Sequence, residues 1–320
     1  MLCALQDSAK DFKVVEVGAR DGLQNEKSLV PTAIKIELIE RLANCGLREV
    51  EATSFVSPKW VPQMSDQIDV VNGIQRLPGV SYPVLVPNLI GFNNAMATGC
   101  VKEIAVITAA SESFSRKNTN SSTEEALKRS CDIASEAIKL GIKVRGYISC
   151  VIGCPYDGPV KPASVLRIAE ELLRVGCYEV SLGDTIGVGS AGSVNRLLNS
   201  LLNNLPVESL AVHFHDTYGQ ALANVLTSIE RGIRIADSSI AGLGGCPYAK
   251  GASGNMATED LIYMLNDLGV NTVNLLSTSF FLNSGVDLDS LIEVGEWICT
   301  KLNRLNGSKT ATAMIRKRCI

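Results

Sequence analysis

Short runs of β-branched and other apolar residues alternate with longer amphipathic stretches between Phe12 and about Leu268. Such a run is typical of a buried parallel strand, and the stretch after it is typical of the helix that leads to the next strand. The pattern predicts eight strands, at Lys13–Val17, Glu49–Ala52, Tyr82–Val86, Glu103–Thr108, Lys143–Ser149, Tyr178–Gly183, Leu210–His215 and Ile235–Ala241. Eight such units favour an α/β fold of the (β/α)8 TIM barrel type. A doubly wound open sheet is the alternative, because its strands and helices alternate with the same period.

The helices between these strands have recognisable ends. Pro31 can open the first helix, and Ser122 followed by Glu125 resembles a capping box. Gly141 and Gly176 lie where helices should stop, because glycine readily adopts the left-handed conformation that ends many helices. These local signals support a helical interpretation of the amphipathic stretches.

The end of the chain differs from the repeating part. Leu288–Leu305 predicts an additional C-terminal helix, and Asn306–Ile320 is expected to form a polar, basic tail. The chain contains no low-complexity linker, so we expect no second globular domain. We divide the chain into an N-terminal extension at residues 1–11, a catalytic barrel at 12–270, and a C-terminal extension at 271–320.

Composition and charge argue against several classes of function. With 320 residues, 46% of them hydrophobic, the chain can bury a substantial core. Its formal net charge of −3 provides no basic surface for a phosphate polymer, so nucleic acid is not an expected partner. No apolar run approaches the roughly 20 residues that span a bilayer, which disfavours a membrane role. The ten cysteines show no CxxC spacing, which indicates reduced thiols in an intracellular compartment.

The strongest chemical signal is the segment LAVHFHDTYG, which contains the two histidines of the chain, His213 and His215. Two residues that lie two apart in a strand point to the same face, and in a barrel strand this face is the interior. Two neutral imidazoles at the mouth of a barrel favour a divalent cation, with Asp21 and the amide oxygen of Asn255 as further ligands. This set of nitrogen and oxygen ligands favours Mg2+ or Mn2+ over a structural zinc. A buried, hydrogen-bonded histidine pair without a metal is the alternative.

The segment VGARDGLQNE follows the first predicted strand and places Arg20 beside Asp21. Asp21 can then bind a cation while Arg20 donates to a thioester carbonyl oxygen, which is the combination that enolate chemistry requires. Gln24, in the same segment, is expected to bind substrate together with Arg20. A turn with a local salt bridge is the alternative interpretation of the Arg-Asp pair.

The segment AGLGGCPYAKGASGN is rich in glycine, which predicts a mobile loop that can bring Cys246 into the site as an acid or base. A second GCPY at Gly153–Tyr156 shows that this tetrapeptide alone does not define a catalytic cysteine. We prefer Cys246 over Cys154 because Asn255 and Glu259 follow it closely. Three carboxylates near strand ends are weaker catalytic candidates that could equally be structural partners: Glu51, Asp184 and Glu259.

Six segments together resemble the 3-hydroxy-3-methylglutaryl-CoA lyase family: VEVGARDGLQNEK, EATSFVSPKWVPQM, RGYISC, YEVSLGDTIGVG, AVHFHDTYGQALAN and SSIAGLGGCPYAKGASGNMATEDLIYML. The resemblance runs from about Asp11 to Gly269. It implies that Arg20 polarises the acyl carbonyl and that Cys246 is the active-site thiol. It also implies cation ligands at Asp21, His213, His215 and Asn255, and supporting acids at Glu51, Asp184 and Glu259.

The reaction that the resemblance implies is a retro-Claisen cleavage of an acyl-CoA, with acetoacetate and acetyl-CoA as products, in leucine catabolism and ketone-body formation. In this reaction the cation would bind the tertiary 3-hydroxyl group and a carboxylate oxygen. The family also implies a homodimer or higher homo-oligomer. Relative to the family, Val273–Ser284 is an extra segment that could alter packing or assembly.

The family implies the mitochondrial matrix as the compartment. However, the opening MLCALQDSAKDF contains Asp7 and Asp11 and no arginine, and so matches a mitochondrial presequence poorly. The cytosol is therefore the alternative. The ending Arg318–Ile320 does not match a peroxisomal signal, and Cys319 could form a contact between subunits.

Two rival functions remain open. A metal-dependent Claisen synthase would use similar chemistry in the opposite direction, although the glycine-rich segment around Cys246 favours a lyase. A catalytically silent barrel that acts as a binding or assembly protein is the second rival. The presence of Arg20, Asp21, His213 and the other expected site residues argues against it.

Overall fold

The computed structural model describes residues 11–245, 254–272 and 285–318. Four features expected from the sequence lie outside these residues: the N-terminal extension up to residue 10, Cys246, the extra segment Val273–Ser284, and Cys319. The structure therefore leaves the expectations about these features untested.

Parallel strands form one sheet in the order β2-β1-β11-β10-β9-β6-β5-β4-β3. Their bounds are β1 Lys13–Glu16, β2 Glu49–Val50, β3 Thr53–Ser54, β4 Val84–Leu85, β5 Glu103–Ala109, β6 Lys143–Ser149, β9 Glu179–Asp184, β10 Leu210–Phe214 and β11 Ile235–Ser238. Each predicted strand overlaps one of these strands, and β6 has the predicted bounds. A short antiparallel pair, β7 (Gly153–Cys154) with β8 (Gly158–Pro159), was not predicted.

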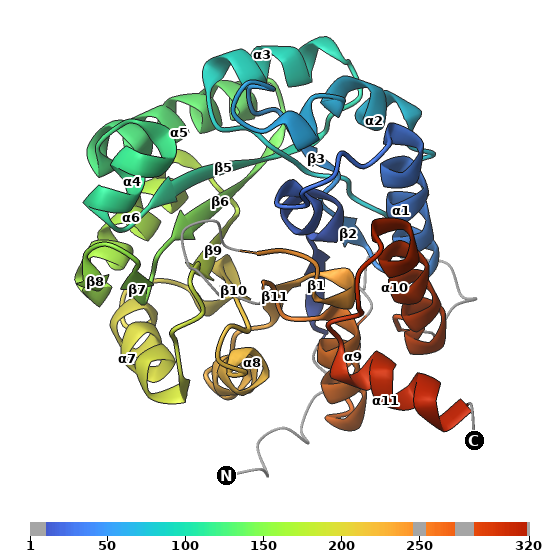
Figure 1. The fold of residues 1–320 in the computed structure, drawn as a ribbon. Coiled ribbons are helices and arrows are strands. Elements are labelled where there is room, and N and C mark those ends of the chain that lie inside the picture. Colours follow the sequence, from blue (N-terminus) through green and yellow to red (C-terminus); the bar gives the residue numbers. More distant parts are fainter. Residues whose placement is uncertain (1–10, 246–253, 273–284, 319–320) are drawn as a thin grey trace.

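The sheet closes into a barrel through the segment that contains β2 and β3. These two strands stand at opposite ends of the sheet order, yet only Glu51 and Ala52 separate them in the chain. The Glu51 amide donates to the Glu16 carbonyl at 2.8 Å on one side, and the Ala52 amide donates to the Pro83 carbonyl at 2.9 Å on the other. The segment thus pairs with β1 and with the strand that contains β4. The TIM barrel prediction is confirmed, and the open-sheet alternative is wrong (Figure 1).

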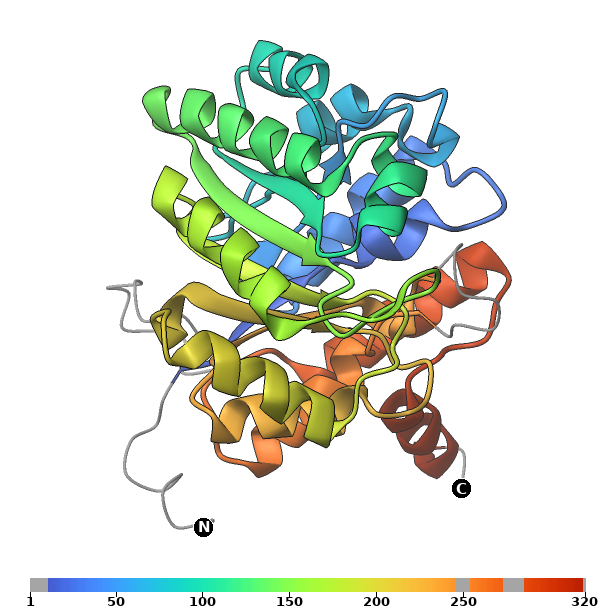
Figure 2. The same cartoon turned by 90° about the vertical axis from the view of Figure 1, so that its left-hand side faces the viewer.

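Helices surround the strands (Figure 1). Their bounds are α1 Thr32–Asn44, α2 Gln67–Gly73, α3 Leu89–Ala97, α4 Glu112–Thr119, α5 Thr123–Lys139, α6 Pro162–Val175, α7 Ala191–Leu202, α8 Ala221–Glu230, α9 Thr258–Asp267, α10 Leu288–Leu302 and α11 Lys309–Arg318. Figure 2 shows α5, α6 and α7 along the outside of the strands. Each buries one apolar stripe against them; in α6 this stripe contains Val165, Ile168 and Leu172.

The predicted helix ends are present. Ser122 and Glu125 form the capping box of α5, and Pro31 directly precedes the first residue of α1. Gly141 and Gly176 follow α5 and α6 with φ angles of 74° and 107°, which glycine adopts without steric cost. Among the described helices, none is both long and apolar enough to cross a membrane.

The C-terminal part contains more structure than predicted. The predicted helix is present as α10, but it ends at Leu302 because Asn303 adopts a left-handed conformation with φ of 51°. The predicted polar tail contains the helix α11. Asp260 of α9 fixes its start, since the carboxylate accepts hydrogen bonds from the Ser308 hydroxyl at 2.7 Å and the Thr310 amide at 2.8 Å. A tertiary contact, rather than an apolar stripe, therefore explains why α11 forms here.

Candidate active site

The barrel interior contains polar side chains that bond across it. The Arg145 guanidinium of β6 donates to Asp237 of β11 at 2.6 Å and to the Tyr147 hydroxyl at 2.7 Å. Because β6 and β11 are not neighbours in the sheet, the Arg145–Asp237 contact must cross the interior. Branched apolar residues usually fill the interior of such a barrel, so this polar filling needs a specific explanation.

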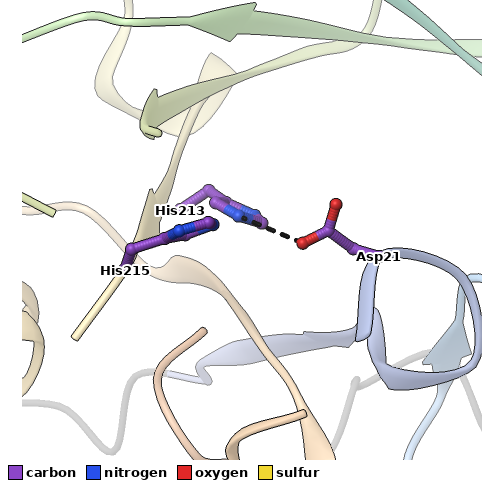
Figure 3. Close-up of side chains that lie close together, drawn as sticks. All are labelled: Asp21, His213 and His215. Atoms are coloured by element: carbon purple, nitrogen blue, oxygen red, sulfur yellow. Dashed lines mark ion pairs between the residues drawn. The ribbon is translucent and has the colours of Figure 1, made fainter. Parts of the chain in front are cut away.

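Asp21, His213 and His215 meet at the carboxyl ends of the strands, with one potential ligand atom of each within 4.8 Å of the others. Figure 3 shows both imidazoles turned toward the Asp21 carboxylate. Asp21 belongs to η2 (Gly18–Gly22), a π-helical turn that follows β1, and the histidines lie at the end of β10 and directly after it. Sequence analysis placed the two histidines on one face of one strand, and the structure brings them together there.

Asp237 sets the orientation of His213. Its Oδ2 lies 3.0 Å from His213 Nδ1 and also accepts a hydrogen bond from the Ser181 hydroxyl at 2.8 Å. This contact leaves Nε2 of His213 facing Asp21 Oδ2 at 4.0 Å, which is too long for a hydrogen bond. Burial lowers the pKa of His213, but the hydrogen bond and charge of Asp237 outweigh it, so the pKa is raised overall. Asp237 therefore acts as the outer carboxylate that orients many metal-binding histidines.

The charge states of this cluster suit a divalent cation. Burial and the neighbouring His213 lower the pKa of His215 to about 4, which keeps its imidazole neutral. Burial raises the pKa of Asp21, but Arg20 and the histidines lower it further, to about 2 overall, so the carboxylate is ionised. His215 Nδ1 is buried and has no hydrogen-bond partner among the described residues. The ionised Asp21 carboxylate, the neutral imidazole of His215 and its buried nitrogen, which the described residues leave unpartnered, fit a site for a metal ion, which would displace any proton on His213 Nε2.

Asn255 reaches the cluster through backbone pairing. It forms an antiparallel bridge with His215, and its Nδ2 donates to Asp21 Oδ2 at 2.7 Å and to the Leu243 carbonyl at 3.1 Å. Both partners are acceptors, so the amide nitrogen faces them instead of the amide oxygen that we predicted as a ligand. In this arrangement Asn255 orients Asp21.

Arg20 lies beside the cluster and is only 4% exposed. Its Nε donates to Glu51 Oε2 at 2.7 Å and its Nη1 donates to Asp21 Oδ1 at 2.6 Å, while the guanidinium lies 5.4 Å from the ring centre of Tyr147. Burial raises the pKa of Glu51, and the charge of Arg20 opposes this rise. Glu51 is thus the partner that holds the guanidinium next to Asp21.

Two of the remaining predicted residues, Asp184 and Glu259, form hydrogen bonds outside this cluster. Asp184, at the end of β9, accepts hydrogen bonds from the Gly189 amide at 2.7 Å and the Val188 amide at 3.3 Å, so it orders its own loop. Glu259 of α9 accepts a hydrogen bond from the Ala241 amide at 2.9 Å. Gln24 is half-buried shortly after η2. Cys246 lies outside the described residues.

Sequence analysis missed Asp237, Arg145 and Tyr147. All three lie in predicted strands at positions that face the interior, where a charged or hydroxyl-bearing residue is unusual. A charged residue in the middle of an otherwise apolar strand was the signal that could have identified Asp237 and Arg145.

Comparisons with known proteins agree with this geometry. The HMGL-like family model matches residues 11–298. Hydroxymethylglutaryl-CoA lyase, mitochondrial, from Mus musculus is 56% identical over 304 residues, which cover 95% of this chain and 90% of the relative. The cytoplasmic 3-hydroxy-3-methylglutaryl-CoA lyase of the same species is also 56% identical, over 96% of this chain and 85% of the relative.

Solved structures share the fold at similar coverage. The crystal structure of hydroxymethylglutaryl-CoA lyase from Pseudomonas aeruginosa has a TM-score of 0.90 and 52% identity, and covers 96% of this chain and 98% of that chain. An HMG-CoA lyase from Acinetobacter baumannii, in complex with coenzyme A and 3-methylmalate, has a TM-score of 0.87 and 33% identity, with 95% of both chains covered. From the family match and the identity over nearly its whole length, we conclude that the chain belongs to the HMG-CoA lyase family.

Proposed function

We propose that this chain is a hydroxymethylglutaryl-CoA lyase, which cleaves 3-hydroxy-3-methylglutaryl-CoA into acetoacetate and acetyl-CoA. The observation that carries the proposal is the cluster of Asp21, His213 and His215 next to the Arg20 guanidinium, at the carboxyl end of the barrel. The high identity to relatives of that name supports the choice of substrate.

The three clustered side chains would hold a divalent cation, Mg2+ or Mn2+. Asn255 is the fourth proposed ligand through its amide oxygen, and binding would require the amide, whose nitrogen bonds to Asp21 in this structure, to reorient. Hard oxygen ligands together with imidazole nitrogens favour these ions. When bound, such a cation supplies Lewis-acid polarisation of substrate oxygens.

The protein residues have separate proposed roles in the cleavage. The 3-hydroxyl proton leaves to a base, the bond between carbons 2 and 3 breaks, and its electron pair moves into the thioester enolate. Carbon 2 of this enolate then takes up a proton to give acetyl-CoA, while the 3-hydroxyl carbon becomes the ketone of acetoacetate. Arg20, held by Glu51, donates to the thioester oxygen on which negative charge develops. Cys246 is the proposed acid or base that moves a proton, and Gln24 helps to bind the substrate. Asp184 and Glu259 support the loops that surround the site.

Several wider features are also proposals. The printed names of the relatives include both mitochondrial and cytoplasmic lyases, and we propose the mitochondrial matrix, with the cytosol as the alternative. We propose a homodimer or higher homo-oligomer, and we retain the division into an N-terminal extension at residues 1–11, a barrel at 12–270 and a C-terminal extension at 271–320. A bound coenzyme A in a solved relative supports the acyl-CoA partner.

The decisive experiment strips the purified chain with a chelator and measures acetoacetate release from 3-hydroxy-3-methylglutaryl-CoA, with and without Mg2+ or Mn2+. We expect activity only after metal is restored. Cys246→Ala should abolish most of this activity, whereas Cys154→Ala, the matched change in the second GCPY tetrapeptide, should retain it. A folded, metal-binding chain that releases no acetoacetate would overturn the proposal. A condensation product formed from acetyl-CoA instead would favour the synthase alternative.

A further inference from the structure

One buried carboxylate connects three segments near the carboxyl ends of the strands. Glu16, the last residue of β1, is fully buried. Its Oε1 accepts hydrogen bonds from the Gly18 amide at 2.7 Å and the Ile240 amide at 2.9 Å, and its Oε2 accepts one from the Thr258 hydroxyl at 2.5 Å. These partners belong to η2, to the turn η5 (Ile240–Gly242) after β11, and to the start of α9.

The segments that Glu16 joins are in close contact. A side chain at Gly18 would lie 2.6 Å from Glu16 Oε1 and 2.8 Å from Ile240, and one at Gly22 would lie 2.8 Å from Leu243. Glycine is therefore required at both positions so that η2 can lie directly against residues 240–243. The position of Arg20 and Asp21 on η2 is thus fixed relative to this turn.

Further contacts extend the same connection toward the site. Asn255 Nδ2 bonds to both Asp21 and the Leu243 carbonyl, and Asn25 Nδ2 donates to the Gly245 carbonyl at 3.0 Å. Gly245 directly precedes Cys246 in the sequence. Glu16 is the innermost of these contacts, at the point where both segments leave the barrel strands.

Packing alone does not explain a carboxylate at this place. No ion pair joins Glu16 to a cation within the described part of the chain, and burial raises its pKa to about 7, although its three hydrogen bonds lower it. A buried acid without a cation partner is costly, so an apolar residue would be the simpler choice for the core. The carboxylate instead provides acceptors for three donors that belong to three separate segments.

We propose that Glu16 is a positioning residue that holds the η2 turn, with Arg20 and Asp21, in register with the Ile240–Gly242 turn and the start of α9. The inference rests on the proposed function, because it assumes that Asp21 holds the metal and that Arg20 donates to the substrate. Glu16 touches no substrate and acts only through the backbone that it holds.

The test measures Mn2+ affinity by calorimetry on the full chain, together with kcat and KM. We expect Glu16→Ala to weaken Mn2+ binding about tenfold and to lower kcat more than it raises KM, the range seen when an outer partner of a metal site is lost. Glu16→Gln should recover most of the affinity, because its amide oxygen can still accept from Gly18 and Ile240. Glu16→Asp keeps the charge but shortens the reach to both amides, and should weaken Mn2+ binding even if Glu16→Ala does not fold.

Glu49 provides the matched control. It is also a buried glutamate whose pKa burial raises to about 7, but it lies at the start of β2, at the opposite end of the barrel. Glu49→Gln should leave the Mn2+ affinity within about twofold of wild type. Equal Mn2+ affinities in wild type, Glu16→Asp and every folded Glu16 variant would overturn the inference. A wild-type chain that binds Mn2+ without turnover would overturn only the proposed function, and a wild-type chain that binds no Mn2+ would overturn both.

Discussion

Lys13 and the histidine pair lie at opposite ends of the same barrel interior and meet very different partners. At the amino ends of the strands, Lys13 pairs with Glu179 at 2.6 Å and with Glu49 at 3.2 Å. At the carboxyl ends, His213 Nε2 and Asp21 Oδ2 stand 4.0 Å apart, and His215 Nδ1 has no hydrogen-bond partner among the described residues. At the amino end the carboxylates are paired with Lys13, although Glu49 Oε1 also has no hydrogen-bond partner among the described residues. At the carboxyl end, in contrast, Asp21, His213 and His215 bring potential ligand atoms within 4.8 Å of one another.

Arg145 connects the two ends. We call Lys13, Glu49 and Glu179 the amino-end group, and Asp21, His213 and His215 the carboxyl-end group. Arg145 Nε bonds to Glu179 of the amino-end group at 2.6 Å, and Arg145 Nη2 bonds to Asp237, which holds His213 of the carboxyl-end group. The ion pairs of Arg145 with Glu179 and Asp237 thus help to position His213. The comparison teaches that polar residues inside this barrel are not all functional: ion pairs such as Lys13–Glu179 support the structure, and side chains whose ligand atoms converge, as in Asp21, His213 and His215, are candidates for ligand binding.

The largest expected effect comes from removing a ligand of the carboxyl-end group. His213→Ala should lower kcat/KM by about three orders of magnitude or more, because a catalytic metal supplies several kcal/mol of transition-state stabilisation. Mn2+ binding, measured by calorimetry, should fall with it. Lys13→Met at the amino end should instead cost about 3 kcal/mol of unfolding free energy, because Glu49 loses its ion-pair partner while Glu179 keeps only Arg145, and Mn2+ affinity should be retained. Similar losses of metal affinity in both variants would refute the division between the two ends.

Arg20→Lys sharpens the comparison within the carboxyl end. Lysine keeps the charge but cannot bond to Glu51 and Asp21 while it also donates to a substrate oxygen in a fixed geometry. We expect kcat/KM to fall by about 10²–10³, the effect of losing one donor to a developing oxyanion. Mn2+ affinity should change much less than the rate. A loss of Mn2+ binding as large as the loss of rate would assign Arg20 to the metal site alone.

Asp237→Asn tests whether Asp237, which joins Arg145 to His213, orients the His213 imidazole. The amide keeps the shape but has no negative charge to hold the imidazole of His213. Mn2+ affinity should fall by about 10- to 100-fold, and the rate at saturating Mn2+ should recover in part. Ser181→Ala removes a weaker partner of the same carboxylate and should have a smaller effect in the same direction. Unchanged affinity in Asp237→Asn would show that packing alone orients His213.

The sequence was sufficient to predict the barrel and the meeting of Asp21 with both histidines, because strand periodicity places alternate residues on one face. It could not predict the amide orientation of Asn255, which depends on acceptors supplied by Asp21 and Leu243, distant in sequence. It also could not show that Arg145 reaches Asp237, since that contact exists only after the sheet closes. Helix α11 was missed for the same reason, because Asp260 fixes its start from another helix.

The smallest expected effect concerns Glu49 in the amino-end group. Burial raises the pKa of Glu49 from 4.5 to about 7, and Lys13 opposes this rise while Glu103 and Glu179 add to it. An acid with a raised folded-state pKa favours the folded chain fully below pH 4.5, and this contribution is lost as the pH rises through about 7. Glu49→Gln stays neutral, so its stability relative to wild type should increase between pH 5 and pH 8, by at most about 3 kcal/mol. Urea unfolding at both pH values measures this difference, and a constant difference would show that Lys13 keeps Glu49 ionised throughout. Activity should stay close to that of wild type at both pH values, because the amino-end group provides no ligand to the site.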